Sequence, residues 1–143
     1  MASNQVQYSL LHGAPKRDGV LAACRALGVT LIAYSPRAQG VLTGKYGPDR
    51  PPGDFRRVRY GRRFWERVEP VLAAPRTVAS SRGKTPARVA LNWLKGAIPI
   101  PGAKNARQAQ ENAGALGWRL TDEEAAELKR AASAGAPKAQ AVS

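Results

Sequence analysis

Cysteine is almost missing from this sequence. Cys24 is the only one among 143 residues, which excludes an internal disulfide and the cysteine-rich frameworks that hold structural metals. Residues 19–27 have helical spacing that places Val20, Leu21, Cys24 and Leu27 on one face, so we expect the thiol to be buried. These features predict a protein of a reducing compartment without a metal site.

Long apolar runs are also missing. The longest ones, residues 29–34 and 97–101, are far shorter than the ~20 residues that a membrane-spanning helix needs. Residues 1–8 show neither the basic and apolar regions of a signal peptide nor the arginine-rich pattern of a transit peptide. We therefore expect no membrane contact and a cytoplasmic protein, or a plastid protein if an upstream extension is missing.

Acidic residues are scarce: 10 Asp and Glu stand against 23 Lys and Arg, a formal charge of +13. This balance favours an anionic partner. Many of the arginines lie in residues 50–67, with aromatic residues between them, a mixture that can bind nucleic acid. Because the run contains no recognised nucleic-acid motif, we expect a solvated loop that leads into a helix, and a basic interaction module remains the alternative.

Apolar periodicity predicts one α/β domain. Residues 4–8 and 29–34 have the character of strands and flank the helix over 19–27, with Gly28 as its stop, which makes a βαβ unit and implies a parallel sheet. A further buried strand is expected over residues 97–100. Residues 35–61 are expected to be irregular. The other predicted helices cover residues 62–73, 76–81, 85–95, 106–115 and 122–132. Pro75 is expected to separate the first two of these helices. Residues 134–143 are expected to form a flexible tail.

Three predicted helices carry start signals. Thr85 followed by Pro86 is typical of an N-cap and a first helical residue. Asn105 with Gln108, and Thr121 with Glu124, have the spacing of a capping box, in which the two side chains bond each other's main-chain N–H groups.

Two loops that follow strands suit an anion. The turn at Gly102 enters the helix over residues 106–115 directly, and Lys104 and Arg107 add donors beside the unpaired N–H groups of its first turn. Alone, this turn fits a tight connection with solvated cations equally well. The loop after residues 29–34 is also rich in small and basic residues: Ser35, Gly40, Thr43, Gly44 and Lys45. Since ligands gather at the carboxyl ends of parallel strands, the pair of loops favours an elongated, doubly anionic ligand such as a dinucleotide.

Four segments, residues 4–12, 28–46, 83–94 and 98–118, resemble the aldo/keto reductase family, and the resemblance extends over most of residues 3–133. It implies a (β/α)8 TIM barrel in which residues 4–8, 31–34 and 97–100 are the sixth, seventh and eighth strands. The chain would then be a partial barrel, with residues 1–133 as the C-terminal part of the reductase domain and five strands missing.

The resemblance further implies NADP(H) as cofactor, with a role for each matching residue. Gln5 would contact the nicotinamide carboxamide and Tyr34 would stack on its ring, although spacing alone fits a half-buried core tyrosine equally well. Arg37 stands where a leucine usually packs beside the cofactor. The pyrophosphate would be lined by Ser35, Pro36, Gly40, Leu42, Gly44 and Lys45. The 2′-phosphate and adenine end would be held by Gly102, Lys104, Gln108, Glu111 and Asn112.

The family's chemistry is hydride transfer between NADPH and a carbonyl, with a tyrosine as proton donor that is assisted by lysine, aspartate and histidine. Neither the tyrosines of this chain nor His12 match those positions, so we expect no catalytic residue here. A carbonyl substrate is expected only if the barrel is completed, and the open edges of the sheet favour self-association. A non-functional fragment is the remaining alternative. Two departures from the family, Pro75 inside a helix and Arg88 in place of a capping glutamine, are expected to be unfavourable.

Overall fold

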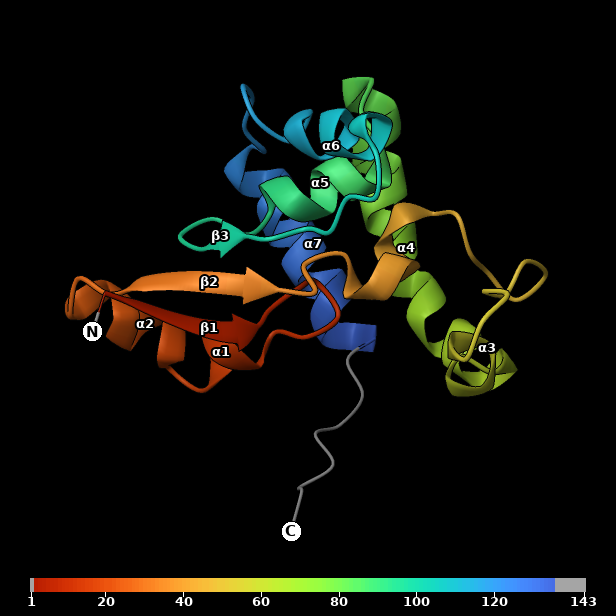
Figure 1. Ribbon diagram of the computed structural model, residues 1–143, viewed down its shortest axis with the longest axis horizontal. Helices are drawn as coiled ribbons and strands as arrows, with labels where there is room; N and C mark the ends of the chain where they lie inside the picture. Colours follow the sequence, from red (N-terminus) through yellow and green to blue (C-terminus); the bar gives the residue numbers. More distant parts are fainter. Residues whose placement is uncertain (1, 136–143) are drawn as a thin grey trace, which may run out of the picture.

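The computed structural model describes residues 2–135 and contains a parallel sheet of three strands. The strands are β1 (Ser3–Gln7), β2 (Thr30–Tyr34) and β3 (Ile98–Pro99), in the order β1-β2-β3. Gln5 lies opposite Ile32 in the register, and Ile32 lies opposite Ile98. The predicted α/β class and parallel sheet are confirmed, and the sheet with its helices is consistent with part of a barrel (Figure 1).

Helices follow each strand and cover one face of the sheet. Leu31 and Ala33 of β2 are buried, whereas Thr30 and Tyr34 on the opposite face are exposed. The connecting elements are α1 (Ala14–Arg17), α2 (Val20–Ala26), the 3-10 segment η1 (Ala38–Thr43), α3 (Arg56–Arg59), α4 (Arg62–Arg82), α5 (Pro86–Asn92), α6 (Ala106–Ala113) and α7 (Asp122–Gly135). Residues 35–61, predicted to be irregular, thus contain η1 and α3, and the chain between η1 and α4 extends away from the sheet (Figure 1).

The strand predicted over residues 97–100 is present as β3, but the prediction that it is buried is wrong. β3 has two residues, and the side chains of Ile98 and Ile100 are 55% and 46% exposed. Their apolar character is that of a strand covered on both faces, but β3 is an edge strand of a three-stranded sheet. The face to which Tyr34 and Ile98 belong therefore stays open.

Pro75 does not separate two helices, as the sequence had predicted. α4 continues through both Pro70 and Pro75 for 21 residues. Proline lacks the N–H of one helical hydrogen bond, but the Pro75 ring is buried and neighbouring side chains such as Leu72 and Val78 join the core. Packing along α5 and α7 therefore maintains the helix in spite of the proline.

The ends of several helices differ from the prediction. Leu27, expected on the buried face of α2, is 76% exposed because the helix ends at Ala26 and Gly28 turns the chain with φ +64°. Gly28 thus stops the helix as predicted. α5 ends at Asn92 and α6 at Ala113, each earlier than expected. α7 extends to Gly135, beyond the predicted start of the tail at residue 134, and residues 136–143 lie outside the described part.

All three predicted N-caps are confirmed, but the capping box of Asn105 and Gln108 is half formed, because Gln108 Oε1 accepts from the N–H of Lys104 and not from that of Asn105. Thr85 Oγ1 accepts a hydrogen bond from the N–H of Arg88 at 3.3 Å, and Asn105 Oδ1 accepts one from the N–H of Gln108 at 3.0 Å. Thr121 and Glu124 form the complete reciprocal box, with distances of 2.8 and 3.1 Å. Among residues 2–135, no helix is both long and apolar enough to span a membrane.

Glu124 connects the start of α7 to the end of α4. Its carboxylate accepts two hydrogen bonds from Arg82, each at 2.8 Å, and one from the N–H of Thr121. The bonds from Arg82, followed by the bond from Thr121, lower the pKa of Glu124 to about 2.

We expect Glu124→Gln to reduce the free energy of unfolding at neutral pH by about 1 kcal/mol, as for loss of a helix cap or a partly exposed ion pair. The carboxylate is stabilised when the chain folds, so its contribution is complete above the ordinary glutamate pKa and is lost as the pH falls toward about 2. Urea unfolding from pH 7 to pH 2 measures this difference. Glu123→Gln, at the exposed neighbouring position, is the matched control, and a pH-independent difference for Glu124→Gln would contradict the assignment.

Candidate functional site

The carboxyl ends of β2 and β3 open into the same cavity. The N–H of Ile100 donates to the carbonyl of Ala33 at 3.0 Å, so the two loops that follow the strands begin side by side. A cavity of about 630 Å³ lies between these loops and the first turns of α6. The loops after β2 and β3, which the sequence predicts to bind an anion, therefore meet as expected.

Eight of the fourteen predicted cofactor residues line this cavity, which we call the cofactor cavity. They are Ser35, Pro36, Arg37, Gly40, Lys45, Gly102, Lys104 and Gln108. The other six, which are Gln5, Tyr34, Leu42, Gly44, Glu111 and Asn112, lie elsewhere. The structure thus brings together most of the predicted residues of the two loops, and leaves outside those of the sheet, those of later α6, and Leu42 and Gly44 of η1.

The lining is strongly basic. Arg37, Lys45, Arg56 and Lys104 contribute four cationic side chains, and no carboxylate is among the described residues that line the cavity. The charge of Arg56 is balanced by an ion pair with Asp54, which lies outside the lining. Arg37 Nη2 also donates to the carbonyl of Gly102 at 2.6 Å, which ties the two loops together. Such a concentration of positive charge in a concave site favours an anionic ligand.

The main chain of the first loop is held in an uncommon conformation. Ser35, Ala38 and Gln39 have positive φ angles of 50°, 48° and 55°, and Gly40 has φ +95°. A non-glycine residue in this region costs on the order of 1 kcal/mol or more, and such residues cluster at functional sites. The loop keeps its shape through internal bonds, among them Thr43 Oγ1 to the Gly40 carbonyl at 2.6 Å.

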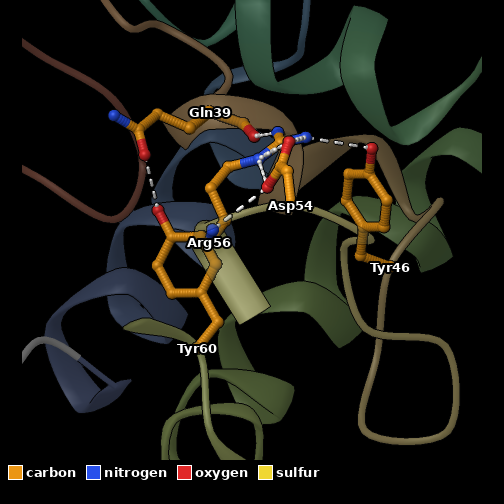
Figure 2. A network of polar contacts seen from close by, with 5 residues as sticks. All are labelled: Gln39, Tyr46, Asp54, Arg56 and Tyr60. Atoms are coloured by element: carbon orange, nitrogen blue, oxygen red, sulfur yellow. Dashed lines mark hydrogen bonds and ion pairs between the residues drawn. The ribbon is translucent and has the colours of Figure 1, made fainter. Parts of the chain in front are cut away.

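Arg56 stands at the centre of the polar network in Figure 2. Its guanidinium forms a bidentate pair with Asp54, at 2.8 and 2.7 Å, and donates to the main-chain carbonyl of Gln39 at 2.6 Å. Tyr46 OH accepts a longer bond at 3.4 Å, and Tyr60 OH donates to Gln39 Oε1 at 3.0 Å. Hydrogen bonding to Arg56 lowers the pKa of Asp54 to about 2, and the same pair raises the pKa of Arg56. The network attaches residues 54–60 to the strained turn.

Sequence reasoning missed Gln39, Tyr46 and Arg56 as lining residues. Arg56 had been counted with the solvated basic run of residues 50–67. The one available signal was Asp54, the only acidic residue between positions 50 and 65, which lies two residues before Arg56. Most of the other arginines of the run, including Arg57, Arg59 and Arg62, are exposed, as expected.

The start of α6 offers fewer free N–H groups than expected. The N–H of Gln108 is bonded to Asn105, and the N–H of Lys104 donates to Gln108 Oε1 at 2.7 Å. Two donors that a phosphate would use are therefore already paired. At this end of the cavity, the Lys104 side chain is the more available donor for an anion.

Glu111 and Asn112 lie on α6 but away from the cofactor cavity. Glu111 forms an ion pair with Arg88 at 3.0 Å and accepts a hydrogen bond from Thr85, so it neutralises the arginine that was expected to be unfavourable. Asn112 Nδ2 donates to the Gly102 carbonyl at 3.4 Å. Asn112 Oδ1 is buried and has no hydrogen-bond partner within residues 2–135.

The remaining predicted residues belong to the sheet and to η1. Gln5 and Tyr34 lie on the open face of the sheet, where both are exposed. The Leu42 side chain is fully buried in the core, so only its main chain could contact a ligand. Gly44 ends η1 with φ +74°. The roles given to these four residues stay predictions.

The tyrosines and the histidine show no arrangement typical of a proton donor. Tyr8 is buried against Trp93, and burial raises its pKa. Tyr46 and Tyr60 belong to the Arg56 network. The His12 side chain lies after β1, where burial lowers its pKa. In the part of the chain that the structure describes, no group of three His, Cys, Asp or Glu side chains could hold a metal ion.

Comparison with known proteins agrees with the family resemblance. A sequence model of the Aldo/keto reductase family matches residues 1–133. The chain belongs to the aldo/keto reductase family. The chloroplastic pyridoxal reductase of Arabidopsis thaliana is 42% identical over 134 residues, which are 92% of this chain and 36% of that protein. An aldo-keto reductase of Schizosaccharomyces pombe, named with NADP(+), is 37% identical over 89% of this chain and 40% of its own length.

Solved structures of aldo/keto reductases share the fold. An aldo/keto reductase from Klebsiella pneumoniae, in complex with NADP and acetate, superposes with a TM-score of 0.64 and 26% identity over 96% of this chain and 41% of that one. The glycerol dehydrogenase of Gluconobacter oxydans reaches a TM-score of 0.84 at 24% identity, over 96% and 44% of the two chains, which shows the fold alone. This aldo/keto reductase chain thus spans well under half the length of these relatives.

Gly40 is the position in the cofactor cavity where a side chain fits worst. With φ +95°, an added Cβ would lie 3.1 Å from the Tyr46 ring and 3.6 Å from Arg56 Nη1. We expect Gly40→Ala to lower the free energy of unfolding by about 1 to 3 kcal/mol. Thermal unfolding measures the change, with Gly53→Ala as control because its added Cβ meets nothing within 4 Å. Equal melting temperatures for the two variants would contradict this geometry.

Proposed function

We propose that this chain binds NADP(H) as the C-terminal part of a carbonyl-reducing aldo/keto reductase. It would supply the sixth, seventh and eighth strands of a (β/α)8 barrel and the two loops that hold the cofactor. The observation that supports this most directly is the cofactor cavity, where the loops after β2 and β3 present Arg37, Lys45 and Lys104 without a lining carboxylate.

The donor set fits a dinucleotide that carries an additional phosphate. Arg37 and Lys45 lie beside the strained turn after β2 and would meet the pyrophosphate. Arg56, whose charge is paired with Asp54, would hold the turn in place. Lys104, at the start of α6, would meet the 2′-phosphate. Asn112, to which the family resemblance gives the adenine, lies outside the cavity lining and would have to turn toward the ligand.

The relatives support the choice of cofactor. The K. pneumoniae structure contains NADP, and the S. pombe relative carries NADP(+) in its name. The A. thaliana relative is named for the reduction of pyridoxal, which is consistent with a carbonyl substrate for the family member to which this chain corresponds. We propose that this chain is located in the cytoplasm or in a chloroplast; the A. thaliana relative is named as chloroplastic.

Within this proposal, the chain binds and orients the cofactor but does not complete the reaction. NADPH would supply the hydride, and Gln5 and Tyr34 on the open face of the sheet would position its nicotinamide. The proton donor would come from polypeptide that carries the other five strands. The same polypeptide, or a second copy of this chain, would cover the open face at Tyr34, Ile98 and Ile100, which are 40%, 55% and 46% exposed.

Titration of the protein with NADPH, followed by nucleotide fluorescence, tests the proposal. Lys45→Gln and Lys104→Gln are each expected to weaken binding about tenfold, because a hydrogen bond to a charged group contributes about 1.5 kcal/mol. Arg130→Gln removes the same charge from an exposed position on α7 and is expected to leave the affinity unchanged.

Two results would contradict the proposal. One is an unchanged fluorescence signal at high micromolar protein. The other is an equal loss of affinity for Arg130→Gln, which would mean that NADPH responds only to the net positive charge of the chain.

A further inference from the structure

A second cavity, of about 270 Å³, shares no lining residue with the cofactor cavity. It lies between the turn after β1, the helix α1 and the C-terminal half of α7. Leu10 and Leu11 from the turn, Trp93 from the end of α5 and Ala132 from α7 give it an apolar wall.

This wall is held in place by the core. Leu10 is 2% exposed and Trp93 is 8% exposed. The indole N–H of Trp93 donates to the carbonyl of Ala125 at 3.3 Å, and the Tyr8 ring lies 5.8 Å from the indole ring. The apolar surface is therefore formed before any ligand arrives, as is usual for small-molecule sites.

The rim of the cavity is cationic. Lys16 and Arg17 from α1 and Lys129 from α7 line it, and no carboxylate does so among the described residues. None of these three side chains forms an ion pair within residues 2–135. Asp18 follows Arg17 in the sequence but does not line the cavity.

Lys16 contacts the apolar wall. Its Nζ lies 5.6 Å from the centre of the Trp93 ring. Burial, and then the charges of Lys129 and Arg25, lower the pKa of Lys16. Lys16 and Lys129 thus repel each other across the mouth of an apolar cavity, and an anion between them would relieve the repulsion.

We propose that this second cavity binds a small amphipathic carboxylate. The apolar body of the ligand lies against Leu10 and Trp93, and its carboxylate meets Lys16 and Lys129. A volume of about 270 Å³ is at the lower end for ligand sites, so the ligand carries a one-ring or two-ring body or a short aliphatic chain. The site is separate from the proposed cofactor function and does not depend on it.

Calorimetric titration of the full chain with 2-naphthoate tests this site. We expect one binding site, and at least tenfold weaker binding of 2-naphthamide, which has the same shape without the charge. Lys16→Gln and Lys129→Gln are each expected to weaken 2-naphthoate binding about threefold, as for a solvent-accessible ion pair, and the double variant about tenfold.

The matched controls separate the site from general attraction to a basic chain. Arg130→Gln removes the same charge one residue along α7, outside the cavity lining, and is expected to leave the affinity unchanged. Lys104→Gln, in the cofactor cavity, is also expected to have no effect. Ala132→Leu adds side-chain volume at the apolar wall and is expected to weaken binding of the naphthoate and the naphthamide alike, while the melting temperature reports on folding.

Two outcomes would overturn the proposal. Equal affinity for the acid and the amide would remove the role of the cations. A loss of affinity in Lys104→Gln would place the probe in the cofactor cavity.

Discussion

Parallel pairing of the three strands is the constraint on which the candidate site depends. Because β2 and β3 point in the same direction and are joined by the hydrogen bond from Ile100 to Ala33, their carboxyl ends deliver two loops to the same place. In an antiparallel arrangement, the carboxyl ends of β2 and β3, and with them the two loops, would lie at opposite ends of the sheet. The cofactor cavity is thus a consequence of strand direction, and the individual loop residues only determine what it can bind.

The loops then need additional contacts to hold four cationic side chains near each other. Arg37 reaches the main chain of Gly102, so one cation is fixed by the neighbouring loop. Arg56 is fixed by Asp54 and by the carbonyl of Gln39, which lies 17 residues earlier in the chain. Both arginines are therefore oriented before a ligand binds, whereas Lys45 and Lys104 are exposed. Orientation in advance reduces the entropy that ligand binding would otherwise cost.

Local signals in the sequence were sufficient for the helix starts and for part of the site. Thr85, Asn105 and Thr121 were identified because a cap needs only residues three positions apart. The two loops were identified because glycine and basic residues follow apolar strands. Signals that depend on partners distant in the sequence failed. Pro75 is accommodated by packing against other helices, and Ile98 is exposed because β3 is a two-residue strand at the edge of the sheet, with one face open.

The same distinction applies to single side chains of the site. Asp54, near Arg56 in sequence, indicates a local ion pair but not the bond to Gln39, and nothing near Arg88 indicates that Glu111 neutralises it. Leu42 satisfied the family pattern, but its side chain belongs to the core. Sequence periodicity describes which face a residue occupies, whereas these contacts depend on how α5, α6 and the long loop pack together.

The most direct test of NADPH binding between the loops after β2 and β3 compares the backbone amide chemical shifts of the isotope-labelled chain with and without NADPH. We predict that the largest changes fall in residues 35–46 and 100–112, with a smaller group at Arg56 and its neighbours. Changes that are spread over the exposed arginines of α3 and α4, or that are confined to the cavity beside Trp93, would contradict it.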